Sequence, residues 1–241
     1  MFVHQKLLIK IYAMLFQKLI LNIFTVTSLA LLIFLPQSLF AQTATDIDGN
    51  TYNTVNIGTQ TWFAQNLKTT HFKDKTPIPL VSEKSDWDSL IAPGYCWYSN
   101  DDSLYKEIYG ALYNWYAVNT GTLCPDGWHV PSAADWDTLV SFLGGNYLAG
   151  GVLKIMGIEL WKTPNTGATN EWGFSALPGG THLAGNGFAN LNNSGHWWTS
   201  TEFKDERACS RILLYYTNVI YKDFNNKRNG NSVRCVKARE F

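Results

Sequence analysis

The stretch Leu123–Gly145 constrains the fold of this chain more than any other, because it carries every signal that one amphipathic helix needs. Ser132 occupies the position of an N-cap, and Asp135 follows three residues later as the acid of a capping box. A second carboxylate, Asp137, lies in the first turn, where the helix dipole favours negative charge. Gly144 supplies the left-handed residue that ends the helix. The helix should bury one apolar stripe at helical spacing, made of Trp136, Leu139, Val140 and Leu143.

Residues 1–41 have the composition of an export signal. Three lysines precede an apolar run over residues 19–35, and a small-residue cleavage point follows Ala41. We therefore predict a signal peptide over residues 1–41, which places the mature protein in the periplasm, on the cell surface or outside the cell, without a membrane segment. The alternative is that the apolar run is retained as an anchor, because it is almost long enough to span a bilayer.

Residues 42–241 have the length of a single domain. Lys6, Lys10 and Lys18 fall in the predicted signal peptide, so the remaining chain is slightly acidic against its 19 carboxylates. It has no basic stripe, which argues against nucleic acid as a partner. All 10 tryptophans lie after residue 41, and such large side chains can build a sizeable core.

The four cysteines are best explained as disulfides, because an exported chain is oxidised. The sequence permits three pairings. We expect Cys124 to bind Cys235, which would join the approach to the helix with a last strand near residues 231–237. A loop of about 110 residues closed in this way stabilises the fold by about 4 to 5 kcal/mol in the chain-entropy description. Cys96 and Cys209 would form the second pair. Zinc is disfavoured, because the sequence has no Cys-x-x-Cys and no histidine at a ligand interval from a cysteine.

The remaining regular elements are expected to be mostly short strands. The Asp48-Gly49 turn leads into a hairpin of residues 51–57 with residues 60–64. A short helix capped by Ser82 is expected near residues 82–90. Residues 108–118 fit a buried helix or a buried strand equally well. A second short helix is expected at 148–158, and further strands at 195–202, 208–216, 219–224 and 231–237, with a basic turn at 225–230.

Two polar turns have the composition of cation sites. The turn at residues 46–50 resembles the start of a calcium loop, but Ile57 stands where the loop needs its twelfth-position acid, so a plain turn is favoured. Residues 100–102 fit a solvated turn. No cofactor is expected, and a structural calcium ion is the alternative that these turns leave open.

Residues 161–187 are rich in glycine, asparagine and threonine, which predicts a long excursion with little regular structure. Such loops are uncommon unless they form binding surfaces or fix themselves internally. Aromatic faces stack on sugar rings and amides bind hydroxyls, so the candidates for a glycan site are Trp161, Asn165, Asn170, Trp172 and Asn186. The competing interpretation is that these side chains fill the loop interior. We favour it for Trp172, because Phe174 and Leu177 follow at core spacing.

Catalysis receives little support from the sequence. His129 and His182 are the histidines considered as a base or ligand, and we expect His129 to be structural, since it lies within the approach to the capped helix. No Gly-x-Ser-x-Gly, His-Glu-x-x-His or phosphate-binding loop is present. We therefore assign no catalytic residue.

Eight motifs occur in one order along the chain and together resemble the Fibrobacter succinogenes major paralogous domain over Thr45–Lys237. They are Asp46-Ile-Asp-Gly-Asn-Thr-Tyr, Gln60-Thr-Trp-Phe-Ala-Gln-Asn-Leu, Cys96-Trp-Tyr, Tyr109-Gly-Ala-Leu-Tyr-Asn-Trp-Tyr, Cys124-Pro-Asp-Gly-Trp-His-Val-Pro, Gly173-Phe-Ser-Ala-Leu-Pro-Gly-Gly, Trp197-Trp-Thr-Ser-Thr-Glu and Ser232-Val-Arg-Cys-Val-Lys. The resemblance implies an exported or surface protein of unknown molecular function. Many such proteins are lipoproteins, but this chain has no cysteine near Ala41 to carry a lipid. Cys209 stands where the resemblance leads us to expect an aromatic residue.

More distantly, the capped helix and the terminal Val-Arg-Cys-Val segment are similar to the C-type lectin-like fold and to formylglycine-generating enzymes. This similarity implies an α+β domain of small antiparallel sheets with one or two helices and a long irregular loop region, whose two chain ends meet in one sheet. Fold analogy alone says little about activity. The Glu-Pro-Asn, Gln-Pro-Asp and Trp-Asn-Asp motifs of calcium-dependent lectins are absent.

The sequence therefore predicts a non-catalytic binding or adhesion module of the cell envelope, with a glycan or another envelope protein as its partner. The alternatives are a structural or protein-partner-binding component and, further away, an oxidase-like enzyme related to formylglycine-generating proteins. Exposed and clustered rings at Trp161, Trp172, Trp197 and Trp198 would favour recognition, and buried rings would favour architecture.

Overall fold

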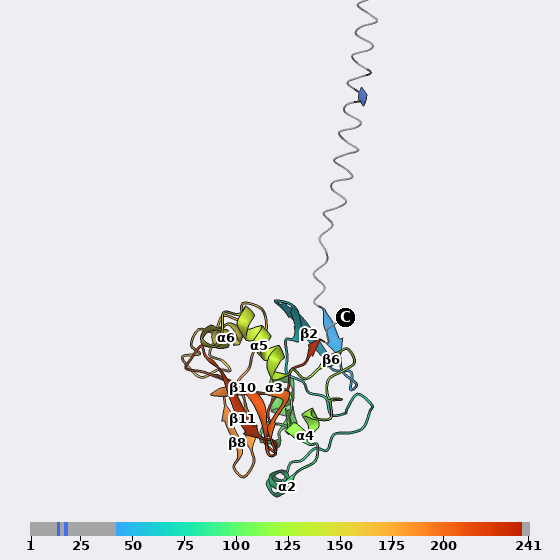
Figure 1. Cartoon of the computed structure of the whole chain (residues 1–241), viewed down its shortest axis with the longest axis vertical. Coiled ribbons are helices and arrows are strands. Elements are labelled where there is room, and N and C mark those ends of the chain that lie inside the picture. The colour runs from blue at the N-terminus through green and yellow to red at the C-terminus, as the bar shows by residue number, and fades with distance from the viewer. Residues whose placement is uncertain (1–13, 15–16, 19–41, 238–241) are drawn as a thin grey trace, which may run out of the picture. The chain divides into compact units, whose positions relative to one another are not determined.

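The structure is a computed structural model that describes residues 14, 17–18 and 42–237 (Figure 1). The chain divides into two units, residues 1–41 and residues 42–241. The predicted signal peptide and its cleavage point lie outside the described residues, apart from positions 14 and 17–18. Among the residues described, no helix is both long and apolar enough to cross a membrane.

The first sheet brings the two ends of the domain together. Its strand order is β1-β2-β3-β12-β6, and all its pairs are antiparallel. The predicted hairpin is confirmed as β2 and β3, and Val236 of the short last strand pairs with Trp62 on one side and His129 on the other. The bounds are β1 Thr43–Thr45, β2 Thr51–Ile57, β3 Gln60–Phe63, β6 Trp128–His129 and β12 Val236–Lys237.

The second sheet has the strand order β11-β10-β9-β7-β8, with β11 and β8 at its edges. All its pairs are antiparallel except β7 with β9, which is parallel. The predicted strands in residues 195–224 are confirmed, although β11 continues into the expected basic turn. A separate two-stranded sheet joins β4 to β5. The bounds are β4 Tyr95–Cys96, β5 Leu112–Tyr113, β7 Gly179–Leu183, β8 Gly187–Leu191, β9 Ser194–Lys204, β10 Arg207–Leu214 and β11 Ile220–Asn226.

The central helix forms as predicted. α5 spans Ala133–Phe142, and its capping box is complete: the Ser132 hydroxyl accepts from the Asp135 amide at 3.1 Å, and the Asp135 carboxylate accepts from the Ser132 amide at 2.9 Å. The predicted stripe faces the core, and Gly144 follows with a positive φ of 89°. The predicted second helix forms as α6, but over Asn146–Leu153 and not over residues 148–158, because the backbone becomes extended at Lys154.

Three local predictions are corrected by the structure. α2 (Lys84–Ser89) has Glu83 at its N-cap and no side-chain cap, so Ser82 lies one residue too early to cap it. Residues 108–118 form neither one helix nor one strand, because they hold the end of α3 (Asp102–Tyr109), β5 and α4 (Trp115–Val118). The polar stretch at residues 100–102 is not a separate turn: Asn100 ends the short 3₁₀ helix η1 (Tyr98–Asn100), Asp102 begins α3, and the Asp101 carboxylate between them caps α3 by accepting from the Leu104 amide at 3.1 Å.

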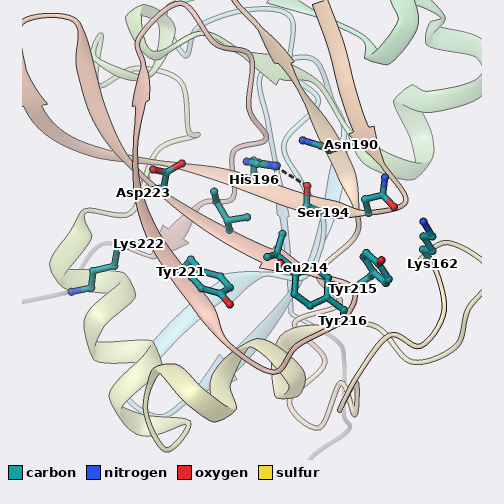
Figure 2. A pocket seen from close by; sticks show the side chains of 12 residues that line it. Lys162, Asn190, Ser194, His196, Leu214, Tyr215, Tyr216, Tyr221, Lys222 and Asp223 are labelled. Atoms are coloured by element: carbon teal, nitrogen blue, oxygen red, sulfur yellow. Dashed lines mark hydrogen bonds between the residues drawn. The ribbon is translucent and has the colours of Figure 1, made fainter.

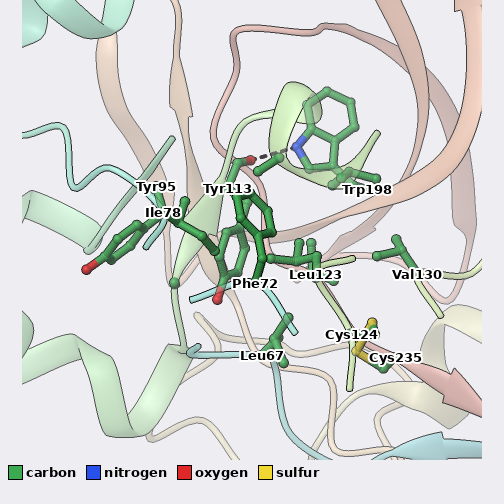
Figure 3. Close-up of a cluster of buried hydrophobic side chains, with 14 of the residues drawn as sticks. Leu67, Phe72, Ile78, Tyr95, Tyr113, Leu123, Cys124, Val130, Trp198 and Cys235 are labelled. Atoms are coloured by element: carbon green, nitrogen blue, oxygen red, sulfur yellow. Dashed lines mark hydrogen bonds between the residues drawn. A yellow bond between two sulfur atoms is a disulfide. The ribbon is translucent and has the colours of Figure 1, made fainter. Parts of the chain in front are cut away.

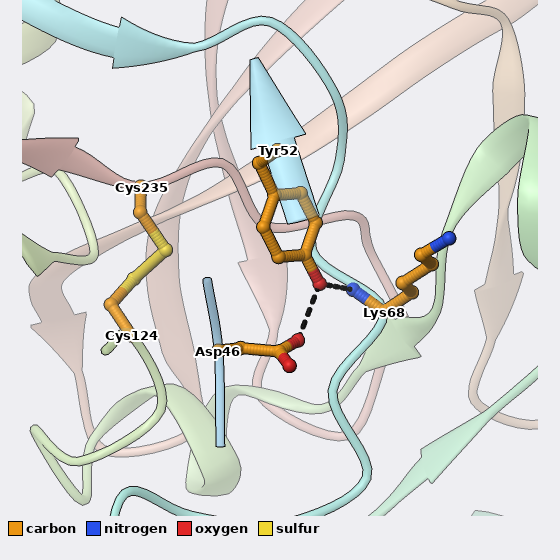
Figure 4. Close-up of a disulfide and its surroundings, with 5 residues drawn as sticks. All are labelled: Asp46, Tyr52, Lys68, Cys124 and Cys235. Atoms are coloured by element: carbon orange, nitrogen blue, oxygen red, sulfur yellow. Dashed lines mark hydrogen bonds between the residues drawn. A yellow bond between two sulfur atoms is a disulfide. The ribbon is translucent and has the colours of Figure 1, made fainter. Parts of the chain in front are cut away.

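One disulfide joins Cys124 to Cys235, as predicted (Figure 4). It lies beside a buried polar contact in which the Tyr52 hydroxyl donates to Asp46 at 2.6 Å and accepts from the Lys68 amide at 3.0 Å. The predicted second disulfide is wrong, because the other two cysteines are free. Cys96 lies on β4 and is buried in a small cluster with Trp87 and Leu112, whereas Cys209 lies partly exposed on β10.

The core forms two large clusters that β9 separates. Neighbouring side chains of a strand point to opposite faces, so Trp198 packs in one cluster with Tyr113 and the disulfide, and Trp197 packs in the other with Trp136 of α5. In the first cluster the Trp198 indole donates to the Tyr113 carbonyl at 2.8 Å (Figure 3). The second sheet is thus fixed from both sides over the residues of β9 that carry these tryptophans.

Candidate binding site

Two of the predicted glycan residues lie inside the protein. Trp161 is 1% exposed and donates its indole N–H to the Ala176 carbonyl at 3.0 Å. Asn165 is buried as well, and its amide donates to the carbonyls of Ile155 and Gly157. Both side chains fix the irregular segment internally.

The other three candidates do not converge on one place. Asn170 holds Ser175 through the Ser175 amide at 2.7 Å, and Asn186 is exposed in the turn between β7 and β8. Trp172 is 38% exposed and packs against Phe142 of α5, with ring centroids 5.1 Å apart, so the core position expected for it is wrong. Trp197 and Trp198 are also fully buried. Of the four tryptophans whose exposure was to distinguish recognition from architecture, three therefore belong to the core and only Trp172 is exposed.

A pocket of about 560 Å³ lies elsewhere, on the face of the second sheet formed by β9, β10 and β11 (Figure 2). This volume falls within the range of small-molecule sites. The lining combines aromatic rings, amides and charged side chains: Lys162, Asn190, Asn193, Ser194, His196, Ile212, Leu214, Tyr215, Tyr216, Tyr221, Lys222 and Asp223.

Three tyrosines form the rim of this pocket, which we call the tyrosine pocket. Tyr215 and Tyr216 follow β10 directly, with rings edge-to-face at 5.1 Å, and Tyr221 comes from β11. The Lys162 ammonium lies 5.2 Å from the centre of the Tyr215 ring. The Tyr215 amide donates to the Asn193 carbonyl at 3.0 Å, which continues the pairing of β10 with β9 and fixes the tyrosine turn beside Asn193.

The floor of the tyrosine pocket is polar and buried. Ser194 and His196 are alternate residues of β9 and therefore share a face. The Ser194 hydroxyl lies 2.7 Å from His196 Nε2. His196 is 8% exposed, and burial lowers its pKa to about 4, against a smaller opposing effect of Asp223. The imidazole is therefore neutral at pH 7, and its buried Nδ1 has no partner among the described residues.

The two histidines considered for catalysis have structural environments. His129 Nε2 lies 3.2 Å from Asp135 of the capping box, and this hydrogen bond is the largest cause that lowers the pKa of Asp135 to about 2. His182 packs between the rings of Trp87 and Phe188, and burial lowers its pKa. Over residues 42–237, no group of three or more His, Cys, Asp or Glu side chains is placed to hold a metal ion.

The lining residues that the sequence analysis missed are the three tyrosines of the rim and the amide side chains of Asn190 and Asn193. The sequence does contain a pattern that predicts this cluster: Tyr215 and Tyr216 precede the turn at Thr217-Asn218, and Tyr221 follows it. Aromatic residues on both sides of a hairpin turn gather at one end of a sheet.

The fold and the pocket define a disulfide-linked α+β domain, built of small antiparallel sheets with few helices, that carries an aromatic pocket on one sheet face. The chain belongs to the Fibrobacter succinogenes major domain family, whose sequence model matches residues 55–237. No curated protein and no solved structure matches the chain.

Proposed function

We propose that this protein is a non-catalytic binding module of the cell envelope and that the tyrosine pocket binds a sugar ring of a glycan. The observation that carries the proposal is the meeting of three tyrosine rings with the side chains of Asn190 and Asn193 around one hollow. Tyrosine offers an apolar face together with a polar tip. A sugar ring has the complementary pattern, with C–H groups on its faces and hydroxyls around its edge.

The floor supports binding rather than chemistry. Ser194 is buried and engaged by His196, which is too weak a base to take a proton from a hydroxyl near neutral pH, since its pKa is lowered to about 4. A neutral, hydrogen-bonding floor suits an uncharged ligand.

We also propose export and a C-type lectin-like architecture. Export is supported by the composition of residues 1–41 and by the disulfide, since disulfides persist in oxidising compartments. The lectin-like architecture is supported by the pairing of β12 with both β3 and β6, which brings the chain ends into one sheet, and by the long irregular segment before β7.

A second candidate function, binding of another envelope protein, is favoured by one surface feature. The rings of Phe203 and Phe224 stack at 3.9 Å, and both residues are exposed. Exposed aromatic side chains are enriched at protein interfaces.

A glycan array probed with the exported protein tests the first candidate. We expect binding to at least one neutral glycan, and a loss of about five- to tenfold in affinity for Tyr216→Ala and Tyr221→Ala, since one aromatic contact is worth about 1 kcal/mol. The matched control is Phe203→Ala, which removes an exposed ring outside the pocket. The proposal would be refuted if the protein bound no glycan on the array, or if all variants bound equally well.

A further inference from the structure

A second hollow adjoins the tyrosine pocket. Its volume is about 390 Å³, and it is lined by Asn146, Tyr147, Val219, Ile220, Tyr221 and Lys222. Tyr221 and Lys222 line both hollows. Because these consecutive residues of β11 point to opposite faces of the sheet, the two hollows lie on opposite faces and share this edge strand as their common wall. That wall is the start of β11, and the far side of the second hollow is the first turn of α6.

The second hollow repeats the chemistry of the first. Tyr147 is 81% exposed, so its ring is open to a ligand. Asn146, which carries a side-chain amide, lines the same hollow. An aromatic ring with an amide in one hollow is the same combination that Tyr215 and Asn193 provide in the tyrosine pocket.

The common wall is polar and held in place. β11 is an edge strand, and in an antiparallel pair only alternate residues direct their backbone groups to the partner strand. The Lys222 ammonium lies 2.8 Å from the Asp137 carboxylate, which also binds Arg211 at 2.6 Å. A ligand that crosses this wall meets hydrogen-bonding groups in fixed positions.

We infer that the two hollows are consecutive subsites for one linear, neutral glycan of at least two sugar rings, which crosses β11 between Tyr216 and Tyr147. This inference rests on the proposed function and specifies its ligand. The lining carries charges of both signs, with Lys162 and Lys222 against Asp223, so neither a polyanion nor a polycation is favoured. Because β11 is an edge strand, such a ligand can pass over its free edge from one hollow to the other.

Arrays printed with linear homo-oligosaccharides of glucose, mannose, xylose, galactose and N-acetylglucosamine, from one to six rings, test the inference. Isothermal titration with the series that binds then gives affinity against chain length. We expect the affinity to rise at least tenfold from one ring to three. Tyr147→Ala should abolish this rise without changing single-ring binding, and Tyr147→Phe should retain it. Leu148→Ala is the control, because Leu148 is an exposed neighbour on α6 that lines neither hollow.

The outcomes separate the two proposals. Single-ring binding that depends on Tyr216, with no gain from longer chains or no effect of Tyr147→Ala, overturns the inference and leaves the proposed function standing. Absence of binding to every series overturns both. Binding of extended peptides from a peptide array, competing with no glycan, also overturns both and assigns the edge of β11 to strand addition.

Discussion

Acidification should destabilise this protein through one buried side chain, His196. Burial lowers its pKa in the folded state to about 4, whereas an unfolded histidine titrates near 6.5. Between these two values the unfolded chain binds a proton that the folded protein does not. The free energy of unfolding must therefore fall as the pH drops from about 6.5 towards 4.

The size of the effect follows from the gap between the two pKa values. Relative to neutral pH, the titration of His196 should lower the free energy of unfolding by about 2 kcal/mol at pH 5 and by about 3 kcal/mol at pH 4, where the pH equals the folded-state pKa. Either figure is a large share of the 5 to 15 kcal/mol that keeps a typical domain folded. Above pH 7 the side chain is neutral in both states and contributes no pH dependence.

Urea denaturation at pH 7 and pH 5 measures this quantity. The variant His196→Gln keeps a polar side chain beside Ser194 but does not titrate, so its stability should fall by about 2 kcal/mol less than that of the wild type. Asn186→Gln is the control, because Asn186 is exposed and the variant retains every histidine. Parallel pH curves for the wild type and His196→Gln would show that His196 is not buried as described and that the floor of the tyrosine pocket is open to water.

Three further predictions concern stability. Replacing Cys124 and Cys235 together by alanine should cost about 4 to 5 kcal/mol in urea unfolding, because their disulfide spans 111 residues; a loss below about 1 kcal/mol would contradict the bond. Ser132→Ala should cost about 1 kcal/mol through loss of the α5 cap, measured as a lower urea midpoint, and an unchanged midpoint would mean that the cap is redundant. Burial lowers the pKa of Lys154 to about 8. Between pH 8 and pH 10.5 the free energy of unfolding of the wild type should therefore rise by about 1 to 3 kcal/mol relative to that of Lys154→Met. Equal pH slopes for the two proteins would refute the burial of this ammonium.

The elements predicted best are those whose signals are local. α5 needs only a capping serine, an acid three residues later and a glycine at its end, and all three lie within the short segment Ser132–Gly144. Residues 108–118 could not be assigned because tertiary contacts divide them: the Tyr113 amide binds the Asn231 carbonyl, and Asn114 caps α4. Several partners of this segment are distant in the sequence, such as Leu67 for Ala111 and Asn231 for Tyr113, so the pattern within residues 108–118 does not reveal them.

The errors at the candidate site have the same origin. Trp172 was expected in the core because Phe174 follows at core spacing, but Asn170 and Gly173 adopt positive φ and reverse the chain, so Phe174 takes the buried position alone. Elimination leaves Cys96 and Cys209 as a pair in the sequence, but they lie on different sheets, Cys96 buried on β4 and Cys209 partly exposed on β10. The tyrosine pocket needs the register of three strands, which composition does not determine.

The disulfide has a role that reaches beyond the residues it joins. Next to Cys235, the fully buried Arg234 donates to the Phe174 carbonyl and to Asn66 Oδ1 at 2.9 Å, and the same Asn66 oxygen accepts from the Trp197 indole at 2.9 Å.

Within the described residues, Arg234 has no carboxylate partner. Its guanidinium is held by these neutral oxygens and by the Phe174 ring, whose centre lies 4.1 Å away. A buried cation held only by neutral oxygens and a ring face is costly if any of them shifts. The backbone around Cys235 must therefore be fixed, and the disulfide fixes it. Because Trp197 lies on β9 directly after His196, the bond also secures the back of the sheet whose front carries the tyrosine pocket. Reduction of the disulfide should thus weaken ligand binding under conditions in which the domain is still folded, whereas a purely global role for the bond would make binding and folding fail together.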